Sequence, residues 1–339
     1  MAQSAKLKDY HEFTAILRDG IQRTGMKGCH CIVALSGGPD SVALLRGLVS
    51  CGSEFNLEIT AAHINHQLRD EESDSDAVWV SDFCAELGIP CNMVEIDVAR
   101  LAQEEGIGIE EAARTARYDA LLRLANEHDS SLIAVAHHRN DQAETVVGNF
   151  LRGSGIAGLR GMQRSRALDD QIRVVRPMLD ASQACVLSYL ASIDQDYRID
   201  STNQQSVATR NRIRNELIPK LENEFNPAIV DAMVRTAEQA REIEEIVESL
   251  VSDLMRVALK YQDKDTIRVD CNVLQGQNRH LIRSLFHQIW RRQNWPRKAM
   301  NYLSWDNLAS LTQNAGAVTL PGNIDARRRG SLLVVTRSC

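Results

Sequence analysis

Paired cysteines at C-x-x-C spacing are missing from this sequence of 339 residues, although it contains eight cysteines. The cysteines are scattered along the chain, so the sequence predicts no disulfide framework and is typical of a reduced, cytoplasmic protein. Cys29 and Cys31 stand close together, but they open a strongly apolar stretch, which favours buried side chains over a metal or redox site.

Long apolar runs are missing as well. No stretch reaches about 18 apolar residues, so we predict no membrane-spanning segment, and the polar stretch from Met1 to Thr14 predicts no secretion signal. Proline is scarce, with 7 residues, whereas hydrophobic residues make up 44% of the chain, which excludes a disordered or fibrous protein. The length favours two globular domains over one.

An excess of positive charge is also absent, because 45 acidic residues outnumber 39 Lys and Arg and give a formal net charge of -6. This balance argues against a protein that coats nucleic acid without selectivity. The charge is uneven, however: residues 67–129 hold 16 acidic residues against 5 basic ones, whereas residues 271–305 hold 6 basic residues and no acidic one. Net charge therefore does not exclude a local RNA-binding surface.

Apolar runs with strand character alternate with helical patterns over the first part of the chain. After an amphipathic helix that ends near Gly25, the predicted strands are 31–35, 57–64, 91–96, 132–136 and, more weakly, 172–175. The helical patterns between them cover 41–49, 72–87, 110–125 and 142–151. This order predicts βαβ units and a parallel, Rossmann-like sheet of the α/β class, with ligands bound beyond the carboxyl ends of the strands.

The pattern changes near residue 220, where we place the boundary between two domains, 1–220 and 221–339. The second domain is predicted to be smaller and mainly helical, with helices over 226–261 and 279–290. Its tail, 317–337, indicates two short strands around turns, so the domain is expected to end in a short β-hairpin.

The first predicted strand leads directly into Ser36-Gly37-Gly38-Pro39-Asp40-Ser41, after which a helix begins. Two glycines allow a tight turn with inward N–H groups, and the helix N-terminus and two serine hydroxyls add donors, so the motif predicts a phosphate cradle. Asp40 cannot bind phosphate directly, but it suits a Mg²⁺ ion beside the phosphates. The alternative is an ordinary turn in which Asp40 or Ser41 caps the helix.

The second predicted strand ends in polar residues. His63, Asn65 and His66 stand there, and contacts to a nucleotide are favoured over a zinc site because no third ligand follows at suitable spacing.

His137, His138, Asp141 and Glu144 follow the fourth predicted strand. Asp141 and Glu144 lie three residues apart on one helical face, which suits an ammonium group or a metal ion, and histidine suits acid–base chemistry near neutral pH. The alternative is a helix whose first turn carries acids that complement the helix dipole.

The hexapeptide at 36–41 resembles the S-G-G-x-D-S loop of the PP-loop ATP pyrophosphatases, which cleave ATP between its α and β phosphates and transfer AMP to a carbonyl oxygen. With the motifs that follow it, the chain resembles one branch of that superfamily, the tRNA(Ile)-lysidine synthases. The motifs stand in the family's order: H-x-N-H-x-L-R at 63–69, E-x-x-A-R-x-x-R-Y at 110–118, A-H-H-x-x-D-Q-A-E-T at 136–145, the glycine-rich segment 152–162, and the segments 176–179, 200–203 and 210–214.

The resemblance implies an activity, substrates and cofactors. In this family, O2 of the wobble cytidine of a CAU-anticodon isoleucine tRNA attacks ATP, and the ε-amine of L-lysine then displaces AMP at C2. The product, lysidine, changes codon reading from AUG to AUA and the amino-acid identity from methionine to isoleucine. ATP and Mg²⁺ are the implied cofactors.

The resemblance also implies roles for single residues. The ATP site would comprise the phosphate-cradle residues and two residues at the end of the second strand, namely Ser36, Gly37, Gly38, Pro39, Asp40, Ser41, His63 and Asn65. Asp40 would hold Mg²⁺, and Arg117, Asp141 and Glu144 would form the lysine site. The catalytic residues would be Asp40, Arg117 and His137, with His137 in acid–base work or in contact with phosphate.

RNA contacts are expected from both domains. Arg152, Arg210 and Arg214 are the candidates in the first. In the second, the basic stretch 271–305 contains Trp290, Trp295 and Trp305, which would stack on bases, with burial in a small core as the alternative for each. The sequence leaves the oligomeric state open, with a homodimer as one candidate.

Two features depart from the family's pattern. Asn140 stands where the family usually has an aspartate, so a metal-ligand role does not carry over to it. The chain ends at Cys339, so we expect one C-terminal domain where other members have two.

The sequence disfavours two other functions. A tRNA thiolase of the same superfamily is disfavoured by the lack of paired cysteines. A catalytically silent RNA-binding protein is disfavoured because Asp40, Asp141 and Glu144 are all present.

Overall fold

A computed structural model describes residues 2–67, 70–199, 209–297 and 299–338. The chain forms two compact units, residues 1–237 and residues 238–339, and the division falls within helix α11 (Ile229–Ala258). The boundary predicted at residue 220 therefore lies before α11, whereas the two units meet inside this helix. Each unit is described by itself.

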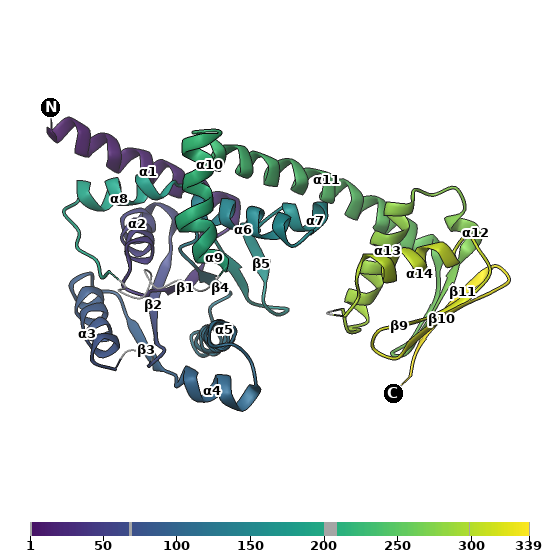
Figure 1. The fold of residues 1–339 in the computed structure, drawn as a ribbon. Helices are drawn as coiled ribbons and strands as arrows, with labels where there is room; N and C mark the ends of the chain where they lie inside the picture. Colours follow the sequence, from purple (N-terminus) through teal and green to yellow (C-terminus); the bar gives the residue numbers. More distant parts are fainter. Residues whose placement is uncertain (1, 68–69, 200–208, 298, 339) are drawn as a thin grey trace. The chain divides into compact units, whose positions relative to one another are not determined.

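The first unit is built on a six-stranded sheet with the strand order β3-β2-β1-β4-β6-β5 (Figure 1). All neighbouring strands pair in parallel except β5, which runs antiparallel to β6 at the edge. The predicted parallel α/β sheet is confirmed. The strands are β1 (His30–Ala34), β2 (Glu58–Asn65), β3 (Cys91–Glu95), β4 (Leu132–Ala134), β5 (Ser165–Ala167) and β6 (Arg173–Val175).

Helices cover both faces of this sheet, which explains why its central strands are apolar throughout. Cys31 and Val33 of β1 face a core shared with α1, α2, α3 and α8, whereas Ile32 packs with Leu121 and Leu124 of α5 on the opposite face. The helices up to residue 192 are α1 (Ala2–Thr24), α2 (Pro39–Phe55), α3 (Asp70–Glu86), α4 (Val98–Glu105), α5 (Ile109–Glu127), α6 (Arg139–Leu151), α7 (Ile156–Leu159) and α8 (Gln183–Ser192).

Strand β1 lies between β2 and β4, and this placement determines where a ligand can bind. The chain leaves β1 for β2 and β3 on one side and returns to β4 on the other, so the connections diverge between β1 and β4. In open α/β sheets, ligands bind at such a switch point, beyond the carboxyl ends of the strands. The loops after β1 and β4 carry the two predicted motifs and flank this point.

A second helical layer packs on α6. It runs through α9 (Thr209–Arg212), a π-helical turn η2 (Ile213–Leu217) and α10 (Ile218–Glu224) into the start of α11. Ile213 and Ile218 bury their side chains against Ala143 and Val147 of α6. The π turn widens the helix locally, a deviation that often accompanies functional sites.

The second unit combines helices with a five-stranded antiparallel sheet of strand order β7-β8-β11-β10-β9. The helices over 226–261 and 279–290 were predicted, but the tail holds three strands and two more precede it, so the sheet is larger than the expected hairpin. Besides the end of α11, the elements are β7 (Leu259–Gln262), β8 (Thr266–Asp270), α12 (Cys271–Leu274), α13 (Arg279–Arg292), α14 (Tyr302–Leu311), β9 (Ala317–Leu320), β10 (Ile324–Arg329) and β11 (Leu332–Arg337).

The three tryptophans of the basic stretch lie in the core of the second unit. Trp290, Trp295 and Trp305 are each at most 6% exposed, and Trp290 packs edge-on against the other two rings. Burial, the alternative reading, therefore holds for all three, and they are not available to stack on RNA bases. Arg279 and Arg283 of the same stretch both pair with Asp306, at 2.7 and 2.8 Å.

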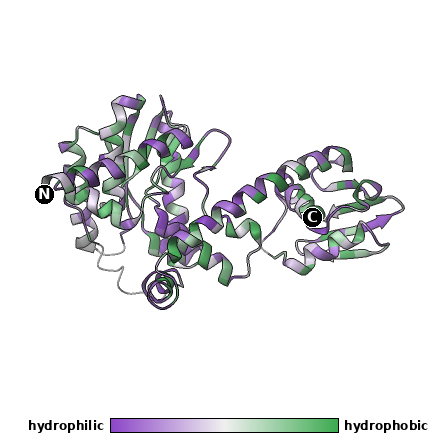
Figure 2. Cartoon of the chain, turned by 90° about the horizontal axis from the view of Figure 1, so that it is seen from above, coloured by the Kyte–Doolittle hydropathy of each residue, from purple (hydrophilic) through white to green (hydrophobic). Residues whose placement is uncertain are grey.

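Hydrophilic residues interrupt the hydrophobic ones along the helices (Figure 2). Within the part of the chain that the structure describes, no helix is long and apolar enough to cross a membrane.

Candidate active site

The loop after β1, residues 36–41, is compact, and we refer to it by its predicted role as the anion cradle. The Oγ atoms of Ser36 and Ser41 lie 3.1 Å apart, and the backbone N–H groups of Ser36 and Gly38 donate to Ser41 Oγ and Ser36 Oγ respectively. Pro39 occupies the first turn of α2, where its missing N–H group costs nothing. The N-terminus of a 17-residue helix thus opens on the switch point and favours a bound anion there.

Gly37 has a backbone conformation that requires glycine. Its φ is +86°, and a Cβ atom at this position would lie 3.2 Å from Cγ2 of Val80. A side chain is disfavoured here both by backbone strain and by contact with α3.

Asp40 links the anion cradle to the N-terminus of α6. Its Oδ2 atom lies 3.6 Å from Nε2 of His138, which follows β4. Its Oδ1 atom is buried and has no hydrogen-bond partner in the structure. A buried carboxylate oxygen without a partner beside a phosphate cradle fits a Mg²⁺ ion, which takes one or two carboxylates and completes its shell with phosphate oxygens and water.

His138 caps α6. Its Nδ1 atom accepts hydrogen bonds from the backbone N–H groups of Asn140 and Asp141, at 3.2 and 3.4 Å. Because Nδ1 is the acceptor, the neutral ring carries its proton on Nε2, the atom that faces Asp40. Asp141 completes the capping box, since its Oδ2 accepts from the backbone N–H of His138 at 3.0 Å.

Asn140, which departs from the family's pattern, connects α6 to α8. Its Oδ1 atom accepts a hydrogen bond from the backbone N–H of Gln183 at the start of α8. The amide thus joins two helices of the fold.

His137 is held neutral by its surroundings. Burial, together with the positive charge of Arg176, lowers the pKa of His137 to about 3. Its Nδ1 atom accepts a hydrogen bond from Nε of Arg176 at 3.1 Å, so Nε2 carries the ring proton. His137 is therefore placed to donate a hydrogen bond, and it does not titrate near neutral pH.

Asp141 and Glu144 form a buried acidic pair on α6. They are 6% and 3% exposed, and the guanidinium groups of Arg210 and Arg214 from α9 and η2 neutralise them. Arg210 Nε lies 2.9 Å from Glu144 Oε2, and Arg214 Nη2 lies 2.7 Å from Asp141 Oδ1. The four charges sum to zero, as burial requires, and cationic groups already occupy the position predicted for an ammonium group.

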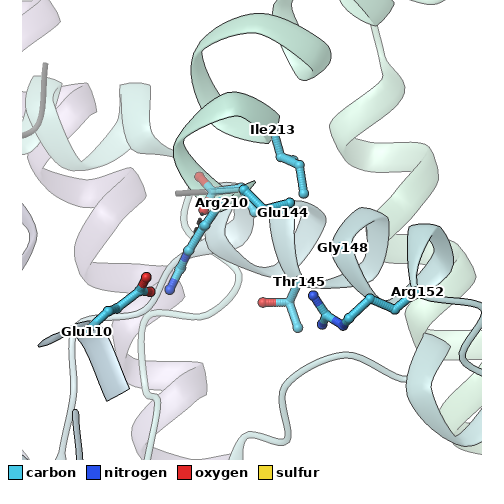
Figure 3. Close-up of a pocket in the computed structure, with 8 residues that line it drawn as sticks. Glu110, Glu144, Thr145, Gly148, Arg152, Arg210 and Ile213 are labelled. Atoms are coloured by element: carbon cyan, nitrogen blue, oxygen red, sulfur yellow. Dashed lines mark hydrogen bonds and ion pairs between the residues drawn. The ribbon is translucent and has the colours of Figure 1, made fainter. Parts of the chain in front are cut away.

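A pocket of about 530 Å³ opens beside this acidic pair (Figure 3). Glu110 and Arg210 point toward one another across it, and Arg152 stands at the other end, where its Nη2 donates to Asn149. The lining residues come from α5, α6 and the residue that follows it, α9 and η2, and are Glu110, Glu144, Thr145, Gly148, Arg152, Thr209, Arg210 and Ile213. The pocket therefore presents both acidic and basic groups, which suits a ligand that carries both charges.

The predicted residues at the end of β2 make contacts within the fold at the same sheet edge. Nδ1 of His63 donates to the backbone carbonyl of Leu35, at 2.9 Å, directly before the anion cradle. Asn65 is buried, accepts from the backbone N–H of Gln67 and donates to Asp74. Leu68 and Arg69 of this motif, like segment 200–203, lie outside the described residues.

Arg117 lies on α5 without a described carboxylate partner. Burial lowers the pKa of its guanidinium, and the positive charges of Arg114 and Arg210 lower it further.

Sequence reasoning did not select Arg176, Tyr118 or Glu110 as site residues. Arg176 directly follows β6, so the strand-end rule that identified His137 would also have found it.

Comparisons with known proteins show which family this chain is similar to. A family model described as a PP-loop domain matches residues 8–221. The tRNA(Ile)-lysidine synthase of Clostridioides difficile is 31% identical over 320 residues, which cover 91% of this chain and 67% of that protein. The synthases of Clostridium tetani and Porphyromonas gingivalis are 41% and 44% identical over 62% and 61% of this chain, and the matched regions cover 44% of each relative.

Among solved structures, the fold is similar to that of the U34-tRNA thiolase NcsA from Methanococcus maripaludis with its [4Fe-4S] cluster. The TM-score is 0.59 at 20% identity, over 70% of this chain and 80% of that one. At this identity the likeness shows a shared fold alone. Within the described residues, no group of three or more His, Cys, Asp or Glu side chains is arranged to hold a metal ion.

Proposed function

The chain belongs to the PP-loop family and, within it, to the tRNA(Ile)-lysidine synthases, and we propose from this that it joins L-lysine to the wobble cytidine of a CAU-anticodon isoleucine tRNA, using ATP. The observation that best supports the proposal is the position of the residues at the N-terminus of α6. His138 at the start of α6 faces Asp40 of the anion cradle, and one turn further the same helix presents Asp141 and Glu144. A nucleotide site and an ammonium site are therefore adjacent.

The first step activates the base. C2 of cytidine is a poor electrophile, so O2 attacks the α-phosphate of ATP, the bond to the β-phosphate breaks, and pyrophosphate leaves. The N–H groups and hydroxyls of Ser36 to Ser41 would bind the phosphates as negative charge develops on the leaving group. Neutral His137 would donate its Nε2 proton as a hydrogen bond to a phosphate oxygen.

Asp40 is the residue that would hold Mg²⁺, through the Oδ1 atom that lacks a partner. When bound, the ion supplies positive charge that offsets the phosphate oxygens and the Asp40 carboxylate together.

The second step transfers lysine. The ε-amine, after loss of a proton, attacks C2 of the adenylated base, and AMP leaves with the electrons of the C2–O2 bond. Asp141 and Glu144 would hold the side-chain ammonium before transfer, and Arg117 would pair with the carboxylate of the amino acid.

Lysine and the two arginines would compete for the same carboxylates. Arg210 and Arg214 are each about 40% exposed in their side chains, whereas Asp141 and Glu144 are buried. We propose that the ammonium replaces at least one guanidinium group, which would then be free to contact RNA, as would Arg152 at the pocket's edge. Charge is conserved in this exchange, so the buried acids are never left unpaired.

The chain spans 44% to 67% of the length of the relatives named above, so the activity must be tested on this chain itself. Pyrophosphate and AMP release would be followed with ATP, Mg²⁺, lysine and a CAU-anticodon isoleucine tRNA transcript. We expect pyrophosphate only when tRNA is present and AMP only when tRNA and lysine are both present, with neither product from a transcript whose wobble cytidine is replaced by uridine. Equal release with either transcript would refute the proposal.

A further inference from the structure

Four arginines gather around one tyrosine of the first unit. The Cζ atoms of Arg114, Arg117 and Arg166 lie 5.3, 5.6 and 5.5 Å from the centre of the Tyr118 ring, within the range of cation–π contacts. Arg176, which follows β6, is 4% exposed and interacts electrostatically with Arg166 and Arg114. We call these four residues the arginine cluster.

Within the described residues, no member of the arginine cluster forms an ion pair with a carboxylate. Arg164, directly before β5, by contrast pairs with Asp180 through both terminal nitrogens, at 2.5 and 2.9 Å. The polar contacts of Arg176 go to neutral acceptors, Nδ1 of His137 and the backbone carbonyl of Gln163. Four like charges thus approach one another without an anion among them, which is unfavourable unless a ligand supplies one.

The pKa values of Arg176 and of the neighbouring His66 are lowered, as expected beside this uncompensated positive charge. Burial lowers the pKa of Arg176, and Arg166 and Arg114 lower it further. Burial also lowers the pKa of His66 to about 4, with a contribution from Arg117. Both effects have the direction expected beside concentrated positive charge.

The arginine cluster extends from the site to the edge of the sheet. Arg176 contacts His137 beyond the end of β4, whereas Arg166 lies exposed on the edge strand β5. The phosphate cradle follows β1, on the other side of β4. A ligand that reaches the arginine cluster is therefore held at a second place, separate from the nucleotide phosphates, and can continue outward past β5.

We infer that the arginine cluster binds a backbone phosphate of RNA next to the nucleotide that reacts. This inference rests on the proposed function. A phosphodiester brings the missing negative charge, and only a polymer extends from a buried site to an exposed edge strand. The carboxylate of lysine, which the proposed function pairs with Arg117, would compensate one of the four arginines and leave the other three for the phosphate.

Arg166→Ala and Arg114→Gln test the inference, because both side chains are exposed and their loss should not unfold the protein. Binding of the isoleucine tRNA transcript is measured over a range of salt concentrations, along with the KM values for ATP and lysine. We expect each variant to bind tRNA roughly tenfold more weakly, with a salt slope reduced by about 1. The KM for ATP should stay unchanged.

Arg173→Ala serves as the matched control. Arg173 is exposed and pairs with Ala167 at the other end of the β5–β6 pair, and its guanidinium group donates to Oγ of Ser165, at 3.3 Å. Its loss should leave both tRNA affinity and the salt slope as in the unmodified protein. If Arg166→Ala and Arg114→Gln behave like this control, the inference is wrong.

Two other results would also overturn the inference. An increase in the KM for ATP alone would assign the arginine cluster to a nucleotide phosphate, and an increase in the KM for lysine alone would assign it to the amino-acid carboxylate. Failure of the proposed function has a different signature, because the unmodified protein would then make no lysidine whatever the variants do to tRNA affinity.

Discussion

Oδ2 of Asp40 lies 3.6 Å from Nε2 of His138, so the first turns of α2 and α6 meet at the switch point between β1 and β4. One residue belongs to the anion cradle and the other caps the helix that carries the buried acids. The contact places the two halves of the proposed reaction, activation and transfer, at one point of the sheet edge.

Asp40→Asn should abolish activation without unfolding the protein. The amide oxygen can still accept from Nε2 of His138, but the negative charge that would hold Mg²⁺ is lost. We expect pyrophosphate release to fall by at least about 100-fold while tRNA affinity is retained. Glu54→Gln is the control, because Glu54 lies on the same helix in an exposed pair with Arg18 and its loss should leave the rate unchanged. Similar rates for both variants would contradict the role of Asp40.

Glu144→Gln should impair the use of lysine. The change keeps the shape of the side chain but removes one of the two charges that would hold the ammonium group. We expect the KM for lysine to rise about tenfold or more while the KM for ATP changes little. The control is Glu216→Gln on η2, which breaks an exposed ion pair with Arg212 of α9 and should change neither KM value. A loss of tRNA affinity alone in Glu144→Gln would remove Glu144 from the lysine site.

Gly37→Ala should destabilise the anion cradle. A φ of +86° costs a non-glycine residue about 1–2 kcal/mol, and the new Cβ would crowd Val80. The free energy of unfolding should fall by that amount in urea denaturation, and pyrophosphate release should fall as well. Gly52→Ala on α2 is the comparison, since a Cβ there meets only ordinary contacts and the helix should gain up to about 1 kcal/mol. Equal effects of the two changes would show that the turn at Gly37 carries no strain.

Acid should destabilise the first unit through His137. Its pKa is about 3 in the folded protein and about 6.5 when unfolded, so the unfolded chain binds more protons between these values. Stability should therefore fall as the pH drops from about 6.5 toward 3, and the loss should be smaller in His137→Gln. Urea denaturation across this range measures it. An identical pH dependence in both proteins would mean that His137 does not remain neutral in the fold.

The sheet could be predicted wherever its strands are buried on both faces. The stretch 31–35 is continuously apolar and was recognised, as was the order of strands and helices around it. Strand β5 was missed because it has three residues, pairs on one side only and exposes Arg166 to solvent. Such an edge strand has no apolar pattern of its own and exists because β6 offers hydrogen bonds.

Those site residues that directly follow a strand could be predicted from the sequence. Asp40 and the pair Asp141 and Glu144 follow β1 and β4, so the parallel sheet alone brings them together. The partners of that pair were not predictable, because Arg210 and Arg214 reach it only through the packing of α9 and η2 on α6. Periodicity would have placed Trp290 correctly, since it shares the apolar face of α13 with Phe286 and Ile289.

Transfer of labelled lysine tests the central claim most directly. The protein would be incubated with ATP, Mg²⁺, labelled L-lysine and the CAU-anticodon isoleucine tRNA transcript, and the tRNA would then be digested to nucleosides. We predict that the label co-migrates with a cytidine derivative whose mass exceeds that of cytidine by one lysine minus one water, and that Asp40→Asn yields none. Recovery of unmodified cytidine, with the label left entirely as free lysine, would contradict the account.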